Sequence, residues 1–224
     1  MDKEYTSHDG RRTHIDKWFE RMSHDPAVAY RVMAEFGVEV NSIGQRFRCP
    51  LPGHGGTDSW AELWRDRNGR IMFHDLHAKE GEDNQWFTLP EVYATIRHPG
   101  NRRRRIRRLE RGEQAIWWIR ALVECGIVEM PPPPMCKQEL PEGTPPEAHA
   151  VYQGFCYRLQ IGVLYEPSQK AAPFADKFAM SWWAIGKRKF RTGFGWLREH
   201  EYVVEHVFDR KVPCRSRLFE LAPV

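Results

Sequence analysis

Cysteine and histidine occur as two close pairs in the first third of the sequence. Cys49 and His54 are separated by four residues on a Pro- and Gly-rich stretch, and His74 and His77 follow as His-x-x-His about twenty residues later. Thiolate sulfur and imidazole nitrogen are the usual ligands of a tetrahedral zinc site. A tight turn within each pair leaves little chain entropy to be lost when a metal ion joins the pairs. The spacing therefore predicts one structural Zn²⁺ bound by these four residues.

A compact β unit is expected to position the two pairs. Phe47-Arg48 is predicted to be a strand that leads into the first pair, and residues 60–64 form a second, aromatic-rich strand. Asn68-Gly69 is a strong hairpin signal, after which residues 70–73 return as the partner strand and lead into the second pair. The two pairs should then meet at one end of this hairpin.

Helices are predicted on both sides of this β unit. Asp25 as the cap and Pro26 at the first helical position begin a helix before it, and Gly37 is the expected stop. Thr88 as the N-cap and Glu91 as the reciprocal cap begin a helix after it. The two helices would supply the apolar faces on which the small sheet packs.

The stretch 25–96 resembles the Cys-His-Cys-Cys zinc-binding domain of bacterial replicative primases. The matching positions are Cys49-Pro50 for the first ligand, His54 for the second, Thr57-Asp58-Ser59-Trp60 for a strand start and Phe73-His74 for the aromatic-His before the third ligand. Asp75 stands where the third ligand Cys belongs in that family, and Ala78 stands where the fourth belongs. The resemblance implies a small zinc-ribbon-like unit with flanking helices.

These two departures leave two interpretations of the site. In the first, the site is rebuilt from His74, or from Asp75 as a substitute ligand, together with His77, and it holds a structural Zn²⁺ ion. In the second, the metal ion is lost and the β unit is held by packing of its aromatic side chains, Trp60 and Trp64 among them. Imidazole and carboxylate are both zinc ligands, so the residue types alone leave both interpretations open.

Length and composition limit the class of protein. The chain has 224 residues, enough for one large or two small domains. Its five cysteines show no regular spacing and no signal-peptide pattern is present, which favours a reduced, cytoplasmic protein over a disulfide framework. No apolar run approaches the length needed to span a membrane, so no membrane partner is expected.

Charge is distributed unevenly along the sequence. Residues 1–96 hold twelve Lys and Arg against sixteen Asp and Glu, residues 97–146 ten against six, and residues 147–224 twelve against eight. This balance argues against DNA binding by the first 96 residues alone.

Residues 97–111 hold eight Arg and one Glu. That run predicts contact with nucleic-acid phosphates, with a solvated helix or pairing to acidic residues of the first domain as the alternatives. The predicted contacts are Arg102, Arg103, Arg104, Arg105, Arg107 and Arg108.

Residues 130–146 are predicted to be a linker. Four consecutive prolines, starting at Pro131, and three later ones forbid a helix and favour extended polyproline II, which acts as a semi-rigid spacer. The predicted domains are a primase zinc-finger-like domain over 1–98, basic connecting helices over 99–129, this linker, and a C-terminal domain over 147–224.

The C-terminal domain is predicted to contain three helices followed by a β-hairpin. The first helix carries Val151, Phe155 and Leu159, the second begins at Pro173-Phe174, the third covers 188–200, and the strands cover 202–208 and 216–221. The third helix ends in Trp-Leu-Arg-Glu-x-x-Tyr-Val and the last strand reads Leu-Phe-Glu-Leu. This order resembles the bacterial winged helix-turn-helix family, and the resemblance implies a recognition helix and a basic wing.

The third helix is the predicted recognition helix. With Phe190, Phe194 and Leu197 directed inward, its early polar residues point outward, where they could enter a major groove. Arg can read guanine through two hydrogen bonds, and basic residues on the wing would hold backbone phosphates. The predicted DNA contacts are Arg188, Lys189, Arg191 and Thr192 on the helix and Arg210, Lys211, Arg215 and Arg217 on the wing. The alternative is a winged helix used only for protein contact.

The sequence as a whole predicts an α+β, non-catalytic DNA-binding protein. An enzyme is not expected, because no Walker-type phosphate loop, Gly-x-Ser-x-Gly or His-Glu-x-x-His motif is present. The expected role is replication initiation or priming on a plasmid, phage or integrated element. The expected partners are duplex DNA at the winged helix, single-stranded DNA at the N-terminal module, and a primase, helicase or other replication protein. A transcriptional regulator with an N-terminal effector or dimerisation domain is the main alternative, and a protein-interaction adaptor is a third.

Overall fold

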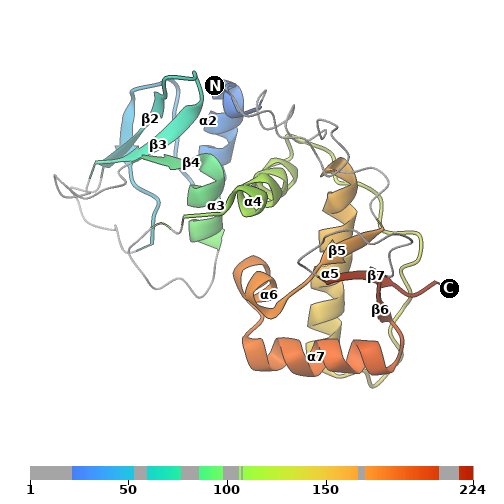
Figure 1. The fold of residues 1–224 in the computed structure, drawn as a ribbon. Helices are drawn as coiled ribbons and strands as arrows, with labels where there is room; N and C mark the ends of the chain where they lie inside the picture. The colour runs from blue at the N-terminus through green and yellow to red at the C-terminus, as the bar shows by residue number, and fades with distance from the viewer. Residues whose placement is uncertain are drawn as a thin grey trace. The chain divides into compact units, whose positions relative to one another are not determined.

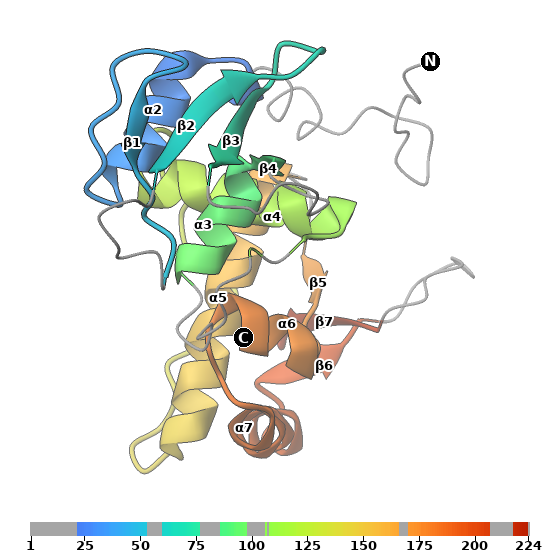
Figure 2. The same ribbon diagram turned by 90° about the vertical axis from the view of Figure 1, so that its left-hand side faces the viewer.

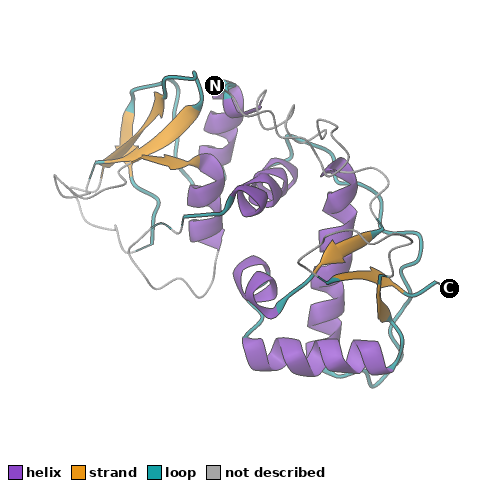
Figure 3. Ribbon diagram, in the orientation of Figure 1, coloured by secondary structure: helices purple, strands orange, loops and turns teal. Residues whose placement is uncertain are grey.

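Two compact units make up the chain, Met1–Glu129 and Met130–Val224. The computed structural model describes residues 22–52, 60–76, 86–97, 106, 108–165, 170–206 and 217–223. Each unit combines helices with one antiparallel sheet (Figures 1 and 3), which confirms the α+β class predicted from the sequence. No helix in the described ranges is both long and apolar enough to cross a membrane.

The first unit is built around a four-stranded sheet. Its elements are α2 (Pro26–Ala34), β1 (Arg46–Arg48), β2 (Trp60–Arg65), β3 (Ile71–Asp75), β4 (Trp86–Thr88), α3 (Leu89–Arg97) and α4 (Arg111–Glu124). The strands pair antiparallel in sequence order, β1-β2-β3-β4. The predicted hairpin at Asn68-Gly69 is confirmed, because Arg65 pairs with Ile71 across it. The Asp66 carboxylate accepts hydrogen bonds of 2.8 Å from the amides of Asn68 and Arg70, which closes the turn.

Burial alternates along these strands, so the two faces of the sheet differ. Phe47, Leu63 and Phe73 are buried on one face, and α3 packs against β3 and β4 (Figures 1 and 2). The intervening residues, such as Trp60 and Trp64, are exposed. Because successive side chains of a strand point to opposite faces, this pattern separates a core face from an outer face.

The caps predicted for the helices that flank the sheet are present at α2 and only in part at α3. Pro26 opens α2 and the Asp25 carboxylate accepts a hydrogen bond from the first turn at 2.9 Å. Gly37 ends that helix with φ of 72°, a left-handed conformation that glycine adopts without steric cost. At α3, the Thr88 amide donates to the Glu91 carboxylate at 3.0 Å, as expected of a reciprocal cap. The predicted N-cap itself is not formed, because the buried Thr88 hydroxyl has no hydrogen-bond partner among the described residues.

Connecting helices were predicted over 99–129, and in the described part of this range residues 106 and 108–110 are not helical. Glu110 is the N-cap of α4 and has an extended backbone, so the helix begins at Arg111. A capping box with Glu113 fixes this start, since the Glu110 amide donates to the Glu113 carboxylate at 3.2 Å. The helix ends at Cys125, as the sequence predicts. Residues 98–105 and 107 lie outside the described part of the chain.

The second unit places three helices around a three-stranded sheet. Its elements are α5 (Pro146–Tyr165), β5 (Ala171–Pro173), α6 (Asp176–Trp182), α7 (Lys187–Glu199), β6 (Val203–Glu205) and β7 (Leu218–Leu221). The antiparallel sheet has the order β5-β7-β6. The predicted start of the second helix at Pro173-Phe174 is wrong, because Pro173 ends β5 and pairs with Leu218 of β7. The β-hairpin is confirmed by the β6–β7 pairing, and residues 207–216 between them are outside the described ranges.

Residues 130–146, predicted to be a spacer, belong to the second unit and run along α5. Pro131 is buried and its carbonyl oxygen accepts a hydrogen bond from Gln160. The amide of Gln138 donates to the Tyr152 hydroxyl at 3.0 Å, and Leu140 packs on the core. The prolines prevent a helix here, as expected, but the segment is held to its own unit by contacts distant in sequence.

Helix α7 crosses α5 at very close range. A Cβ atom on Gly193 would lie 2.4 Å from the carbonyl oxygen of Glu147 and 2.9 Å from the amide nitrogen of Ala148. Both are backbone atoms in the first turn of α5, so only glycine permits this approach. Phe190, Phe194 and Leu197 of α7 are buried, as the sequence predicts for its inner face.

Candidate nucleic-acid interfaces

The outer face of the first sheet carries three exposed tryptophans. Trp60, Trp64 and Trp86 are 41%, 49% and 39% exposed, respectively. Directly paired residues of an antiparallel sheet share a face, and the register pairs Trp60 with Arg48 and Trp86 with His74. Trp60 and Trp64 are about 13 Å apart along β2, at roughly 3.3 Å per residue. We call this surface the tryptophan face, and its members are Arg46, Arg48, Trp60, Glu62, Trp64, Met72, His74 and Trp86.

His74 lies in the middle of the tryptophan face. Its ring stacks on Trp86 with centroids 3.9 Å apart and planes at 7°. Its Nδ1 lies 2.9 Å from a carboxylate oxygen of Glu62, the residue with which it pairs across the strands. Asp75, the next residue, is 7% exposed and points to the opposite face. The structure therefore directs His74 and Asp75, which the sequence offered as alternative ligands, to opposite faces of the sheet.

Cys49 is buried, and its thiol is within reach of the negative charge of Asp75. Burial raises the pKa of the Cys49 thiol to about 12, a backbone hydrogen bond from Leu51 opposes this shift, and the nearby Asp75 carboxylate adds to it. Among the predicted ligands in the described ranges, an electrostatic interaction links Cys49 with the substitute Asp75. His54 and His77 lie outside those ranges, within which no group of three or more Cys, His, Asp or Glu is placed to hold a metal ion. The Zn²⁺ site stays a prediction, and it requires both of these histidines.

The arginine run is anchored to the first unit at its carboxyl end. Arg108 donates to the Glu91 carboxylate at 3.0 Å, and the Leu109 amide donates to the other oxygen at 3.2 Å. Glu91 is 1% exposed, and the guanidinium of Arg108 lies 4.5 Å from the ring centroid of Phe87. Arg108, predicted to contact DNA, is therefore paired with an acidic residue of the first unit, which was the alternative predicted for this run. The other predicted contacts in the run, Arg102, Arg103, Arg104, Arg105 and Arg107, lie outside the described residues.

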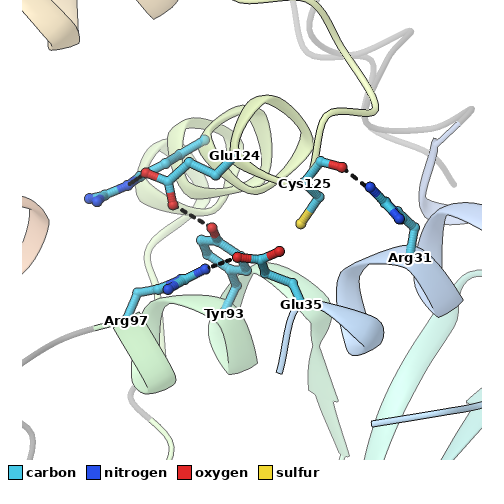
Figure 4. Close-up of polar contacts among 7 residues, drawn as sticks. Arg31, Glu35, Tyr93, Arg97, Glu124 and Cys125 are labelled. Carbon is cyan, nitrogen blue, oxygen red and sulfur yellow. Dashed lines mark hydrogen bonds and ion pairs between the residues drawn. The ribbon is translucent and has the colours of Figure 1, made fainter. Parts of the chain in front are cut away.

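The amino end of the run is anchored as well. Arg97 forms an ion pair with Glu35 and lies over the ring of Tyr93, with 5.6 Å to its centroid. The Tyr93 hydroxyl donates to Glu124, which also accepts a hydrogen bond of 2.7 Å from Arg120. Burial and the contact with Glu124 raise the pKa of Tyr93, so the hydroxyl keeps its proton and remains a donor. Figure 4 shows this cluster joining α2, α3 and α4.

These two anchors change the charge balance of the first unit. Arg97 and Arg108 are both fixed to it, so the charges between them belong with Met1–Glu129. That unit has 21 Lys and Arg against 20 Asp and Glu, whereas residues 1–96 alone are acidic. The charge balance of residues 1–96 therefore leaves out the arginine run, which belongs to the same unit.

The amino-terminal half of α7 presents a cluster of exposed polar residues. Arg188, Lys189 and Thr192 are exposed, and within the described ranges they form neither an ion pair nor a side-chain hydrogen bond. Lys187 and Arg191 lie 3.8 and 3.5 Å from the carboxylate of Asp176 on α6. The predicted helix contacts are thus brought together on one surface, but part of their charge is countered.

The wing residues predicted to hold phosphates are placed only in part. Arg217 donates to Glu205 across the β6–β7 hairpin, with Nε at 2.7 Å from one carboxylate oxygen. This hydrogen bond lowers the pKa of Glu205 and keeps it ionised. Arg217 is therefore half of a pair at the base of the hairpin. Arg210, Lys211 and Arg215 lie outside the described residues.

Comparison with known proteins adds no relative. No protein-family model matches the chain, and no curated protein or solved structure matches it.

Proposed function

We propose that this chain is a non-catalytic DNA-binding protein whose second unit acts as a winged helix on duplex DNA. The observation that carries the proposal is the order α5-β5-α6-α7-β6-β7 with a β5-β7-β6 sheet, in which α7 exposes a basic first half. Helix, strand, two helices and a hairpin in this order resemble a winged helix. Helix α7, which follows α6 along the chain, would then be the recognition helix.

The surface of α7 suits a major groove. Arg188 and Thr192 are one helical turn apart, so they share one side of the helix. Arg donates two parallel hydrogen bonds to guanine, and Thr contacts a phosphate or the methyl group of thymine. Lys189 beside them adds a positive charge for a backbone phosphate. The buried side of α7 meanwhile fixes the helix to the core, which holds these residues in a defined orientation.

Charge reversal on α7 tests the proposal. We expect Arg188→Glu to lower the affinity for duplex DNA at least about tenfold at 0.1 M salt, because a favourable contact becomes a repulsion with phosphate. Fluorescence anisotropy with a labelled duplex measures the change. Lys137→Glu, a reversal of another exposed cation of the same unit, is the control and should change the affinity about twofold or less. An Arg188→Glu variant that binds like the wild type would instead favour the protein-interaction adaptor.

We further propose that the tryptophan face binds single-stranded DNA. Exposed aromatic rings give bases a surface on which to stack, and nearby arginines attract the backbone. The three tryptophans provide the rings, and Arg46 and Arg48 on β1 provide the charge, with the anchored arginine run adding to it. Binding of both duplex and single strand would suit replication initiation or priming on a plasmid, phage or integrated element, with a primase or helicase as a protein partner. A transcriptional regulator has no need for the second activity.

Removal of one exposed ring tests this second proposal. Trp64→Ala should lower the affinity for an oligo-dT single strand about tenfold, since one stacked base contributes on the order of 1–3 kcal/mol. Duplex affinity, which depends on the other unit, should stay the same. Met180→Ala removes a comparably exposed apolar side chain from the second unit and is the control. Unchanged single-strand binding in Trp64→Ala would leave the transcriptional regulator as the better proposal.

A further inference from the structure

Asp176 divides the cations of α7 into two sets. Its carboxylate lies 3.8 Å from Nζ of Lys187 and 3.5 Å from Nη2 of Arg191. These two residues are four positions apart, so they lie on the same side of α7, the side that faces α6. Arg188 and Lys189 make no such contact within the described ranges. Two of the four cations are therefore countered by one acid and two are not.

Asp176 supplies a negative charge to α7 from the neighbouring helix α6. The first turn of α7 contains no acidic residue of its own, and Asp176 is supplied by the first turn of the preceding helix. Its side chain is 26% exposed, whereas those of Lys187 and Arg191 are 56% and 67% exposed. The carboxylate is thus less exposed than the two cations that it pairs with, and a DNA backbone could otherwise attract those cations.

We propose that Asp176 restrains the sequence-independent affinity of α7 for DNA. Sequence-independent binding depends almost wholly on cations that neutralise phosphates and release counterions. A phosphate that approaches this side of α7 meets the negative charge of Asp176, and it must also draw Lys187 and Arg191 away from that carboxylate. The base-directed residues Arg188 and Thr192 do not have this competitor. A lower background affinity reduces the time spent on the many competing sites of a genome.

This inference rests on the proposed duplex binding by α7, and in it Asp176 acts on DNA affinity through Lys187 and Arg191. The test uses the full chain and a duplex of random sequence. Asp176→Asn should raise the affinity about three- to tenfold at 0.1 M salt. The slope of log affinity against log salt concentration should also become steeper by about one to two, since each newly available cation contributes about 0.9. A purely structural role would not steepen this slope.

Glu199→Gln is the matched control. It makes the same charge change at the last residue of α7, where the carboxylate has no ion pair within the described ranges. The control should leave the salt slope unchanged and the affinity within about twofold. Adding Lys187→Gln and Arg191→Gln to Asp176→Asn should abolish the gain, and thermal unfolding of each variant shows that it is folded.

Three outcomes would overturn the inference in different ways. Equal gains for Asp176→Asn and Glu199→Gln would mean that only net charge matters. A loss of affinity in Asp176→Asn would mean that the acid orients the two cations for binding. If the wild type shows no salt-dependent duplex binding, the proposed function fails and the inference fails with it, which the first two outcomes do not imply.

Discussion

Replacement of Gly193 by alanine is expected to lower the free energy of unfolding of the second unit by about 3 kcal/mol. The added Cβ would lie 2.4 and 2.6 Å from the carbonyl oxygen and carbon of Glu147. These atoms belong to the backbone of α5, so no side-chain rotation relieves the overlap. The helices α5 and α7 would have to move apart, which loosens the packing of Phe155, Phe190 and Phe194 between and around them. Denaturant unfolding followed by tryptophan fluorescence measures the loss, and hydrogen exchange of α5 and α7 locates it.

Gly195 provides the contrast within the same helix. A Cβ there would meet no atom within 4 Å. Alanine is favoured over glycine in a helix interior, so Gly195→Ala should raise the free energy of unfolding by about 0.5–1 kcal/mol. Opposite signs for the two variants would support the close crossing of α5 and α7. Two stabilising substitutions would show that the helices are farther apart than the structure has them.

The opposite effects expected for these two glycines depend on a contact that is not apparent from the sequence. The apolar periodicity of Phe190, Phe194 and Leu197 is local, and it correctly predicted the inner face of α7. Helix propensity, in contrast, treats Gly193 and Gly195 alike and assigns each the same cost within a helix. Only the position of Glu147, far away in sequence, separates a required glycine from an optional one. Strand β5 was missed for a similar reason, because three residues become a strand only by pairing with β7.

The alternation of side chains along a strand explains which site residues of the first sheet the sequence analysis placed correctly and which it did not. His74 and Asp75 were chosen by ligand chemistry, yet neighbours in a strand point to opposite faces. Ile71 and Phe73 are the apolar residues of β3 and point to the core. Asp75, two residues after Phe73, therefore points to the core as well, and His74 points to the outer face. One of the two interpretations of the site held the β unit together by packing of Trp60 and Trp64. Both lie an odd number of residues from the buried Leu63, so their side chains point to the opposite, exposed face of the sheet.

The partner of the arginine run could not be found by such local rules. Glu91 was predicted correctly as a helix cap, and the sequence gives no sign that the same carboxylate also accepts hydrogen bonds from Arg108 and the Leu109 amide. Contacts of this kind depend on how the chain returns after a long irregular segment. A count of charges by sequence segment therefore assigned the run to a connector, whereas its two anchors assign it to the first unit.

Glu91→Ala is expected to lower the free energy of unfolding of the first unit by about 3 kcal/mol. Glu91 is 1% exposed, and its carboxylate accepts from the amides of Thr88 and Leu109 as well as from Arg108. Alanine would leave the buried Leu109 amide without its acceptor, and the first turn of α3 without its reciprocal cap. Denaturant unfolding measures the loss, and faster hydrogen exchange at Leu109 shows release of the anchor.

Glu35→Ala removes a carboxylate from the other anchor of the run and is the matched control. The ion pair of Glu35 with Arg97 is solvent-accessible, with both side chains 37% exposed, so water can replace it. Exposed pairs contribute about 0–1 kcal/mol, and the loss in Glu35→Ala should stay within that range. If both variants lose about the same small amount, Glu91 is not the anchor of the arginine run. A large loss in Glu91→Ala alone would show that the contribution of this carboxylate to stability depends on its burial, and not only on its ion pair.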